Sequence, residues 1–163
     1  FPSWRLLLQL VLEGPDQGRP VADWVRAGAT RVAGRQWPQS LMAARSYLIM
    51  PAGRFGPVFI ATDNYYAIKA YNESDLYVLF VGSLADRIAG SGAFATPWRD
   101  VDTFTRPAMQ QVQRKMVALG YNVGDTIDGL IGFRTRTATG MHQKKLGMQV
   151  DCWPNKPFIA RLK

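Results

Sequence analysis

The sequence predicts an α+β fold, in which a small antiparallel sheet packs against one helix and a separate helical unit follows. Three observations lead to this prediction. The first half contains short β-rich segments separated by glycine and proline, a pattern typical of strands joined by turns. Residues 76–89 then repeat apolar side chains at helical spacing. The last third contains two helical patterns, each followed by a glycine.

Four segments of the first half predict strands. Residues 4–13 (WRLLLQLVLE) predict a strand, which the turn-forming cluster 14–18 closes. Residues 47–50 and 58–61 predict two more strands, joined by a loop too rich in glycine and proline for a helix. Residues 66–71 alternate and are β-rich, so they predict a further strand of this sheet.

Two helices are expected in the same half. Residues 20–27 predict a short helix with proline in its first turn and Trp24 facing inward. Residues 72–75 are polar and favour a helix N-cap, so a longer helix is expected from residue 76 to Gly90. Its apolar stripe is expected to face a core, and consists of Leu76, Tyr77, Phe80, Val81, Leu84, Ala85 and Ile88.

A domain boundary is expected where both periodicities disappear. Residues 91–106 mix glycine, proline and threonine without a helical or strand pattern. The predicted units are therefore residues 1–92, a linker over 93–106, and a second unit over 107–163.

The second unit begins with an amphipathic helix. Thr105, Arg106 and Pro107 open it, and Gly120 ends it. The residues expected on its buried face are Met109, Val112, Met116 and Leu119. Another helix is expected over residues 133–146, with Gly147 as its stop.

The net charge of +8 is unevenly distributed. Residues 1–105 hold ten Lys/Arg against nine Asp/Glu, whereas residues 106–163 hold ten against three. The second unit should therefore favour an anionic polymer, either nucleic acid or the carboxylate-bearing peptide stems of a cell wall. The basic residues do not line up on one helix face and no nucleic-acid motif is present, which argues against nucleic acid.

Composition narrows the kinds of site to expect. Apolar residues make up 47% of the chain, enough for a packed core, and no window approaches the roughly 18 apolar residues of a membrane span. Cys152 is the single cysteine, so no internal disulfide is possible and a buried, inert thiol is expected. With one histidine, His142, expected as a packed imidazole, no metal or cofactor is predicted.

Three motifs of the first half are distinctive in combination. They are L-I-M-P-A-G-R-F-G-P-V-F-I, A-Y-N-E-S-D-L-Y and V-G-S-L-A-D-R-I-A-G. In this order they resemble the C-terminal part of lytic murein transglycosylases of the membrane-bound B type, over about residues 18–90. The resemblance implies the C-terminal portion of a lysozyme-like domain. Members cleave the MurNAc–GlcNAc bond with a single Glu, which acts as acid and then as base while a 1,6-anhydro ring closes.

The family's catalytic Glu lies upstream in an E-S-x-x-G type motif, which this sequence lacks. The chain contains two glutamates, Glu13 and Glu73, and neither has the flanking residues. No catalytic residue is therefore assigned. The sequence, which begins at Phe1, is expected to be the C-terminal portion of a larger enzyme, or a paralogue without the lysozyme-like half.

The resemblance also implies glycan-binding residues before and within the long helix: Tyr71, Asn72, Ser74 and Tyr77. Asn72 can donate to and accept from an N-acetyl or hydroxyl group, and tyrosine offers a flat face with a polar tip. An alternative stays open, in which Asn72 and Ser74 only cap the helix and Tyr77 packs in a core. For Ser74 capping is the favoured interpretation.

Two motifs of the second unit, V-Q-R-K-M-V-A-L-G-Y and I-D-G-L-I-G-F-R-T-R-T-A, resemble the three-helix peptidoglycan-binding domain appended to wall hydrolases. The match covers about residues 107–162, with His142 and Cys152 where the family more often has Phe and Gly. It implies these peptidoglycan-binding residues: Gln113, Tyr121, Asp128, Gly129, Gly132, Thr135 and Arg136. The turn at Gly129 can expose N–H groups to a carboxylate, and Arg134 or Arg136, of which Arg136 is favoured, can bind one bidentately. Alternatively, the Asp128–Gly129 pair is only a turn and Arg136 lies on a solvated helix face.

The two resemblances predict a peptidoglycan-binding fragment of a lytic transglycosylase, inactive alone, whose parent is a lyase. Peptidoglycan is the expected partner and nucleic acid is not. The expected location is the periplasm or cell envelope, with outer-membrane attachment only through a lipid anchor of the parent, and a monomer is expected. Two alternatives remain: a complete non-catalytic cell-wall-binding protein, and a basic nucleic-acid-binding protein.

Overall fold

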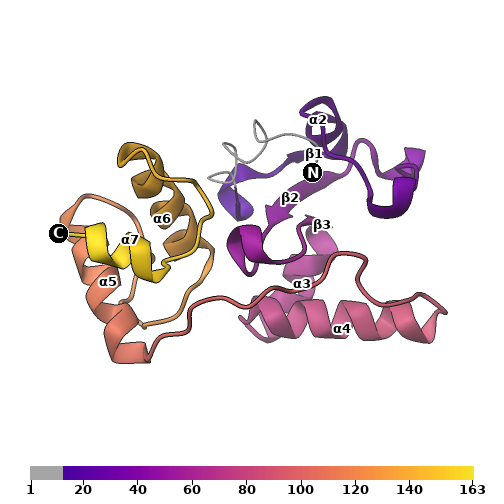
Figure 1. The fold of residues 1–163 in the computed structure, drawn as a ribbon. Coiled ribbons are helices and arrows are strands. Elements are labelled where there is room, and N and C mark those ends of the chain that lie inside the picture. The colour runs from indigo at the N-terminus through magenta and orange to yellow at the C-terminus, as the bar shows by residue number, and fades with distance from the viewer. Residues whose placement is uncertain (1–12) are drawn as a thin grey trace.

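The computed structural model describes residues 13–163. The strand expected over residues 4–13 lies outside the described part, apart from Glu13. Figure 1 shows a sheet-containing unit with helix α4 (Asp75–Ile88) along its lower edge, and a helical unit beside it. The chain returns from the far end of α4 to the helical unit through an extended segment (Figure 1).

The sheet has three antiparallel strands in the order β1 (Arg19–Pro20), β2 (Arg45–Ile49) and β3 (Phe59–Thr62). The antiparallel sheet and its two longer strands were expected, and both are confirmed. In the β2–β3 register, Leu48 pairs with Ile60. Strand β2 is buried over four consecutive residues because it lies in the middle of the sheet.

The expected strand over residues 66–71 is wrong, because these residues belong to helix α3 (Asp63–Tyr71). Asp63 lies in the first helical turn, and Tyr65 and Ile68 lie on one face, three positions apart. This face packs against Tyr47 of β2 and Val78 of α4. A run of only six residues fits both the strand period and the helix period, and the contacts with β2 and α4 favour the helix.

Helix α2 (Val21–Arg26) confirms the short helix expected over residues 20–27, but Pro20 is its N-cap residue and not part of its first turn. Trp24 is 2% exposed, as expected, and its indole N–H donates to the Ser46 carbonyl at 3.4 Å. Short 3-10 turns precede and follow α2, and a further one lies in the loop between β2 and β3. They are η2 (Pro15–Gln17), η3 (Val32–Gly34), η4 (Gln39–Leu41) and, in the β2–β3 loop, η5 (Gly53–Phe55).

Helix α4 occupies nearly the expected residues, but the expected orientation of its apolar stripe is wrong. Val78 is the fully buried residue of α4, whereas four apolar residues at successive i+4 positions are exposed: Leu76, Phe80, Leu84 and Ile88. The helix packs against α3 and the sheet through the face containing Val78. Sequence periodicity identifies an apolar stripe but not the partner that covers it.

The helical unit contains α5 (Arg106–Ala118), α6 (Phe133–Lys145) and α7 (Lys156–Arg161). Thr105 caps α5 by accepting from the Ala108 N–H at 3.4 Å. The expected face of α5 is buried at Met109, Val112 and Met116, while Leu119 remains 39% exposed. The three buried residues form one core with Ala138 of α6 and Phe158 of α7.

The two units share packing and backbone hydrogen bonds. Cys152, from the loop after α6, is fully buried in the same core as Trp24 and Met50. The segment between α4 and α5 contains no helix or strand, and the Arg99 N–H in it donates to the Phe55 carbonyl at 2.8 Å. The C-terminal loop therefore completes the core of the first unit.

Candidate functional site

The turn between α3 and α4 brings the four expected glycan-binding residues together. Ser74 Oγ accepts from the Tyr77 N–H at 3.4 Å, which is the N-cap. Asn72 Oδ1 accepts from the Ser74 N–H at 3.1 Å. Tyr71 is 85% exposed, and its ring centroid lies 6.3 Å from that of Tyr77. Ser74 thus caps the helix, while Asn72 and Tyr71 lie at the surface.

A buried group of charges lies beneath this turn. Arg136 of α6 donates from Nε to Glu13 Oε2 at 2.9 Å and from Nη2 to Glu13 Oε1, and Nη2 also reaches Asp75 Oδ2 at 3.1 Å. Asp75 Oδ1 accepts from the Tyr65 hydroxyl at 2.8 Å and from Lys69 Nζ. The first residue of α4 is thereby connected to the second unit.

These contacts determine the charge states of the group. Burial by itself raises the pKa of Asp75, but Arg136 and Lys69 hold it below its ordinary value. Burial also opposes the charge of Arg136, yet Glu13 and Asp75 raise its pKa. Burial, followed by the charge of Asp75, raises the pKa of Tyr65 and Tyr66. The group is a buried cation held between two carboxylates.

Neither glutamate has the surroundings of a catalytic acid. Glu13 is 2% exposed, and Oε1 also accepts from the Met50 N–H at 3.0 Å. Both of its oxygens are therefore occupied and shielded from any ligand. Glu73 is exposed on the turn before α4, rather than enclosed in an apolar pocket.

The expected ligand-binding residues of the second unit mostly bond to one another. Gln113 is 1% exposed and donates to Asp128 Oδ1 at 3.1 Å and to Thr135 Oγ1 at 3.2 Å. Gln113 Oε1 accepts from the Gly129 N–H at 2.8 Å, and Asp128 Oδ1 accepts from the Leu130 N–H at 2.8 Å. This network stabilises the loop before α6 from within. Asp128 is exposed, and Gly132 is the exposed N-cap residue of α6.

The expectation that Arg136 grips a ligand carboxylate, or lies on a solvated helix face, is wrong. Its side chain is 3% exposed, and its donors bond Glu13, Asp75 and the Ile131 carbonyl. Tyr121 is half-buried, and its hydroxyl lies 3.2 Å from Nδ1 of His142. His142 is 5% exposed and its pKa is lowered by burial and then by Lys145, as fits the expected packed imidazole. Burial raises the pKa of the Cys152 thiol, as an inert thiol requires.

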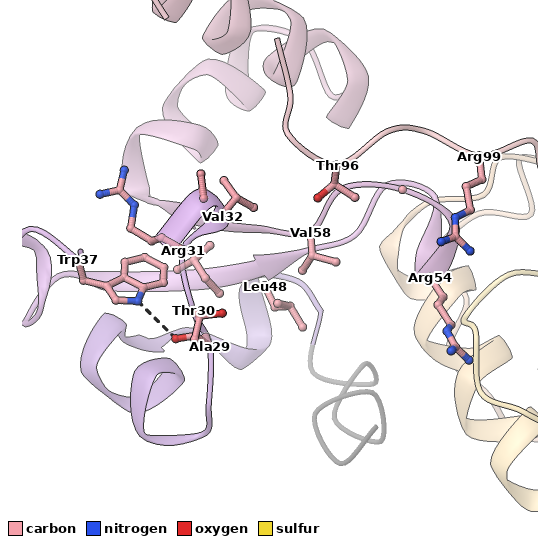
Figure 2. A pocket seen from close by; sticks show the side chains of 13 residues that line it. Ala29, Thr30, Arg31, Val32, Trp37, Leu48, Arg54, Val58, Thr96 and Arg99 are labelled. Carbon is pink, nitrogen blue, oxygen red and sulfur yellow. Dashed lines mark hydrogen bonds between the residues drawn. The ribbon is translucent and has the colours of Figure 1, made fainter. Parts of the chain in front are cut away.

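The structure also contains a pocket of about 670 Å³ that sequence reasoning missed. Figure 2 shows Trp37 and Arg31 at one end, Arg54 and Arg99 at the other, and Leu48 and Val58 between them. The lining comes from the segment after α2, the sheet, η5 and the segment before α5. Five of the lining residues lie within the motif L-I-M-P-A-G-R-F-G-P-V-F-I, which was singled out only for its resemblance: Leu48, Arg54, Gly56, Val58 and Ile60. Nothing in the local sequence indicates that the segments at residues 29–37 and 96–99 complete a pocket with them.

Within residues 13–163, no group of three or more His, Cys, Asp or Glu is arranged to hold a metal ion. No helix in this part of the chain has the length and apolar character needed to cross a membrane.

Residues 6–86 match the family described as "Transglycosylase SLT domain". The matched residues include the sheet, α3, nearly all of α4 and the exposed turn at Tyr71 and Asn72. The polar network of Gln113 lies outside the matched residues. The sequence has no significant match among curated proteins.

Two solved structures extend the similarity beyond the SLT domain. They are of SltB3 from Pseudomonas aeruginosa, in complex with NAG-anhNAM-pentapeptide and with NAG-NAM-pentapeptide. Each is 33% identical to this chain, with TM-scores of 0.80 and 0.81. The matches cover 94% of this chain and 41% of the SltB3 chain, so this chain spans less than half of SltB3.

Proposed function

We propose that this chain is a peptidoglycan-binding portion of a lytic murein transglycosylase of the membrane-bound B type. The similarity of 94% of the chain to SltB3, solved in complex with NAG-anhNAM-pentapeptide, is the observation that carries the proposal. The SLT domain match over residues 6–86 supports the same enzyme class. The ligand is peptidoglycan, and the location is the periplasm or cell envelope, with any membrane attachment through a lipid anchor of the parent.

The turn before α4 supplies one wall of the glycan cleft. Tyr71 and Tyr77 offer aromatic faces 6.3 Å apart to sugar rings, and Asn72, on the exposed side of the turn, hydrogen-bonds an N-acetyl or hydroxyl group. Ser74 acts on the ligand only indirectly, because its hydroxyl caps α4 and so positions Tyr77. The buried Asp75–Arg136 pair holds this turn rigid from beneath.

The catalytic Glu of the parent lies in a part of the enzyme other than residues 13–163. Glu13 is paired with Arg136, and Glu73 is exposed, so neither protonates a glycosidic oxygen. The parent cleaves the MurNAc–GlcNAc bond with 1,6-anhydro ring formation, and this chain alone binds without cleaving. The exposed apolar stripe of α4, at Phe80 and Leu84, fits burial against that other part.

Residues 107–163 act as a peptidoglycan-binding domain. Their excess of basic residues attracts the carboxylates of the peptide stems. Because the Gln113 network stabilises the loop before α6 internally, contact with ligand is through exposed groups such as Asp128 and the N-terminal turn of α6 at Gly132.

The test mixes the chain with purified sacculi, followed by sedimentation and analysis of the supernatant for 1,6-anhydro muropeptides. The chain should pellet and release no anhydro product. Replacing Tyr71 and Asn72 by alanine should lower the bound fraction, whereas Ile88→Ala, at a residue 80% exposed on the other end of α4, should not. Release of anhydro products would contradict the binding-only role, and failure to pellet would contradict peptidoglycan binding itself.

A further inference from the structure

The pocket beside the sheet has the composition of an anion-binding site. We propose that it binds a carboxylate of the peptidoglycan peptide stem, while the turn before α4 contacts glycan. This inference rests on the proposed function, because peptidoglycan as ligand is what makes a peptide carboxylate the relevant anion. The volume of about 670 Å³ is within the range of sites for small ligands and short peptides.

The charges that line the pocket are all positive. Arg31, Arg54 and Arg99 contribute to the lining, and no aspartate or glutamate does. None of the three arginines forms an ion pair within residues 13–163. Residues 1–12 contain no aspartate or glutamate, so they add no carboxylate partner. A concave site with unpaired cations attracts an anion more strongly than a flat surface does.

Arg54 affects the pKa of one carboxylate, that of Asp151, but this carboxylate is already hydrogen-bonded to other groups. Burial raises the pKa of Asp151, and Arg54 lowers it only weakly in comparison. The Asp151 carboxylate accepts from the Trp153 N–H at 2.8 Å and from the Asn155 amide at 2.7 Å. Asp151 is 7% exposed and is not part of the lining, so it leaves the Arg54 guanidinium available to a ligand.

The polar groups of the pocket suit a carboxylate better than a neutral sugar. Besides the three guanidinium groups, the polar side chains in the lining are the hydroxyls of Thr30 and Thr96 and the Trp37 indole. The indole N–H is directed to the Ala29 carbonyl at 3.3 Å. The lining is therefore rich in donors and poor in side-chain acceptors, whereas sugar hydroxyls need both. Arginine binds carboxylates bidentately, which favours the anionic ligand.

The pocket carries two arginines at one end and one at the other, with an apolar middle, which favours an elongated ligand whose charge is at one end (Figure 2). Figure 2 shows Arg54 and Arg99 at one end, with Leu48 and Val58 between them and Trp37. Arg31 lies over the Trp37 ring at 5.9 Å, with Nη1 bonded to the Gln36 carbonyl at 2.6 Å. A peptide that ends in a carboxylate and carries small apolar side chains matches this arrangement.

The basic end is held in place before any ligand arrives. The Arg54 N–H donates to the Asp151 carbonyl at 2.8 Å, and the Arg99 N–H donates to the Phe55 carbonyl at 2.8 Å. The Trp98 ring packs on Gly56, where an added Cβ would lie 2.7 Å from Trp98 Cε3. Both arginines thus project from anchored backbone, which reduces the ordering cost of binding.

The test measures binding of the whole chain to two separated ligands by titration calorimetry: the glycan-free pentapeptide and a peptide-free NAG-NAM glycan. Arg54→Gln combined with Arg99→Gln should weaken pentapeptide binding about tenfold or more and leave glycan binding unchanged. The matched control, Arg35→Gln combined with Arg87→Gln, removes the same charge from exposed positions outside the pocket and should change neither. Circular dichroism spectra of both double variants should match that of the parent chain.

Several outcomes would overturn the proposal. The proposal is wrong if the pocket variant binds the pentapeptide as well as the parent chain does, or if the control variant loses as much pentapeptide binding. It is also wrong if the pocket variant loses glycan binding instead of pentapeptide binding. Equal competition by inorganic phosphate would reduce the pocket to a general anion site and also overturn it. If the chain sediments with sacculi but does not bind the free pentapeptide, the proposed function stands and the peptide pocket is wrong. If the chain neither sediments with sacculi nor binds the free pentapeptide, both the pocket proposal and the proposed function are wrong.

Discussion

Arg136 and Glu13, which are 123 positions apart, form a buried bidentate ion pair that joins the first described residue to the second unit. Arg136→Met would leave Glu13 buried with one hydrogen bond, from the Met50 N–H at 3.0 Å. We expect a loss of roughly 3–5 kcal/mol in the free energy of unfolding, measured by urea denaturation. Arg114→Met, at an exposed position of α5, should change it by less than about 0.5 kcal/mol.

A double substitution at Glu13 and Arg136 tests whether the guanidinium stabilises the fold through its charge or through packing. Combining Glu13→Gln with Arg136→Met removes the buried carboxylate as well as the cation, so part of the lost stability should return. A double variant less stable than Arg136→Met would show that the guanidinium acts through packing and not through charge.

The lowered pKa of Asp75 predicts that the folded protein loses stability in acid. Burial opposes its charge, but Arg136 and Lys69 hold its pKa below the ordinary value in the folded state. Its contribution is therefore present above the unfolded pKa of about 3.9 and is lost as the pH falls through the folded pKa. Asp75→Asn should be less stable at pH 7, and the difference should shrink below about pH 4. A difference that stays constant with pH would contradict this assignment. Burial raises the pKa of Asp151, so its ionisation should lower stability as the pH rises, the opposite of the effect of Asp75.

His142 is the only histidine of the chain, which isolates its pH effect. Burial and then Lys145 lower its pKa in the folded state, so the stability it contributes is present above about pH 6.5 and is lost as the pH falls through the folded pKa. His142→Phe should flatten the stability profile between about pH 7 and pH 5. Thermal unfolding at matched ionic strength measures this, and an unchanged slope would refute it.

Gly53 lies at the contact between the two units. Its φ is +53°, and an added Cβ would overlap the Asp151 carbonyl oxygen. Gly53→Ala should therefore lower the free energy of unfolding by about 2 kcal/mol or more. Gly92→Ala is the matched control, since nothing lies within 4 Å of a Cβ there, and it should be close to neutral. Equal effects of the two substitutions would mean that the contact does not constrain the fold.

The exposed stripe of α4 can be distinguished from its buried face. Phe80→Gln and Leu84→Gln, at residues 65% and 47% exposed, should each change stability by less than about 0.5 kcal/mol. Val78→Ala, at 3% exposure, should lower it by roughly 2 kcal/mol. A large loss from the stripe variants would mean that another surface of this chain covers them.

Much of the fold follows from local rules, and the sequence predicts it. Glycines mark the ends of α4, α5 and α6, where Gly90, Gly120 and Gly147 have positive φ. Ser74 and Thr105 cap the helices that they were expected to cap. These features depend on residues within one helical turn of each other, so the local sequence is enough to predict them.

The sequence by itself determined where the longer helices and the two main strands lie, and it carried the motifs of the SLT domain. Only the tertiary structure decided that residues 63–71 are helical, that Arg136 faces Glu13 rather than a ligand, and that Arg54 and Arg99 share a pocket. The physical reason is sequence separation. Each of these features depends on contacts between segments distant in the chain, where local propensity and spacing carry no information about which partner a side chain meets.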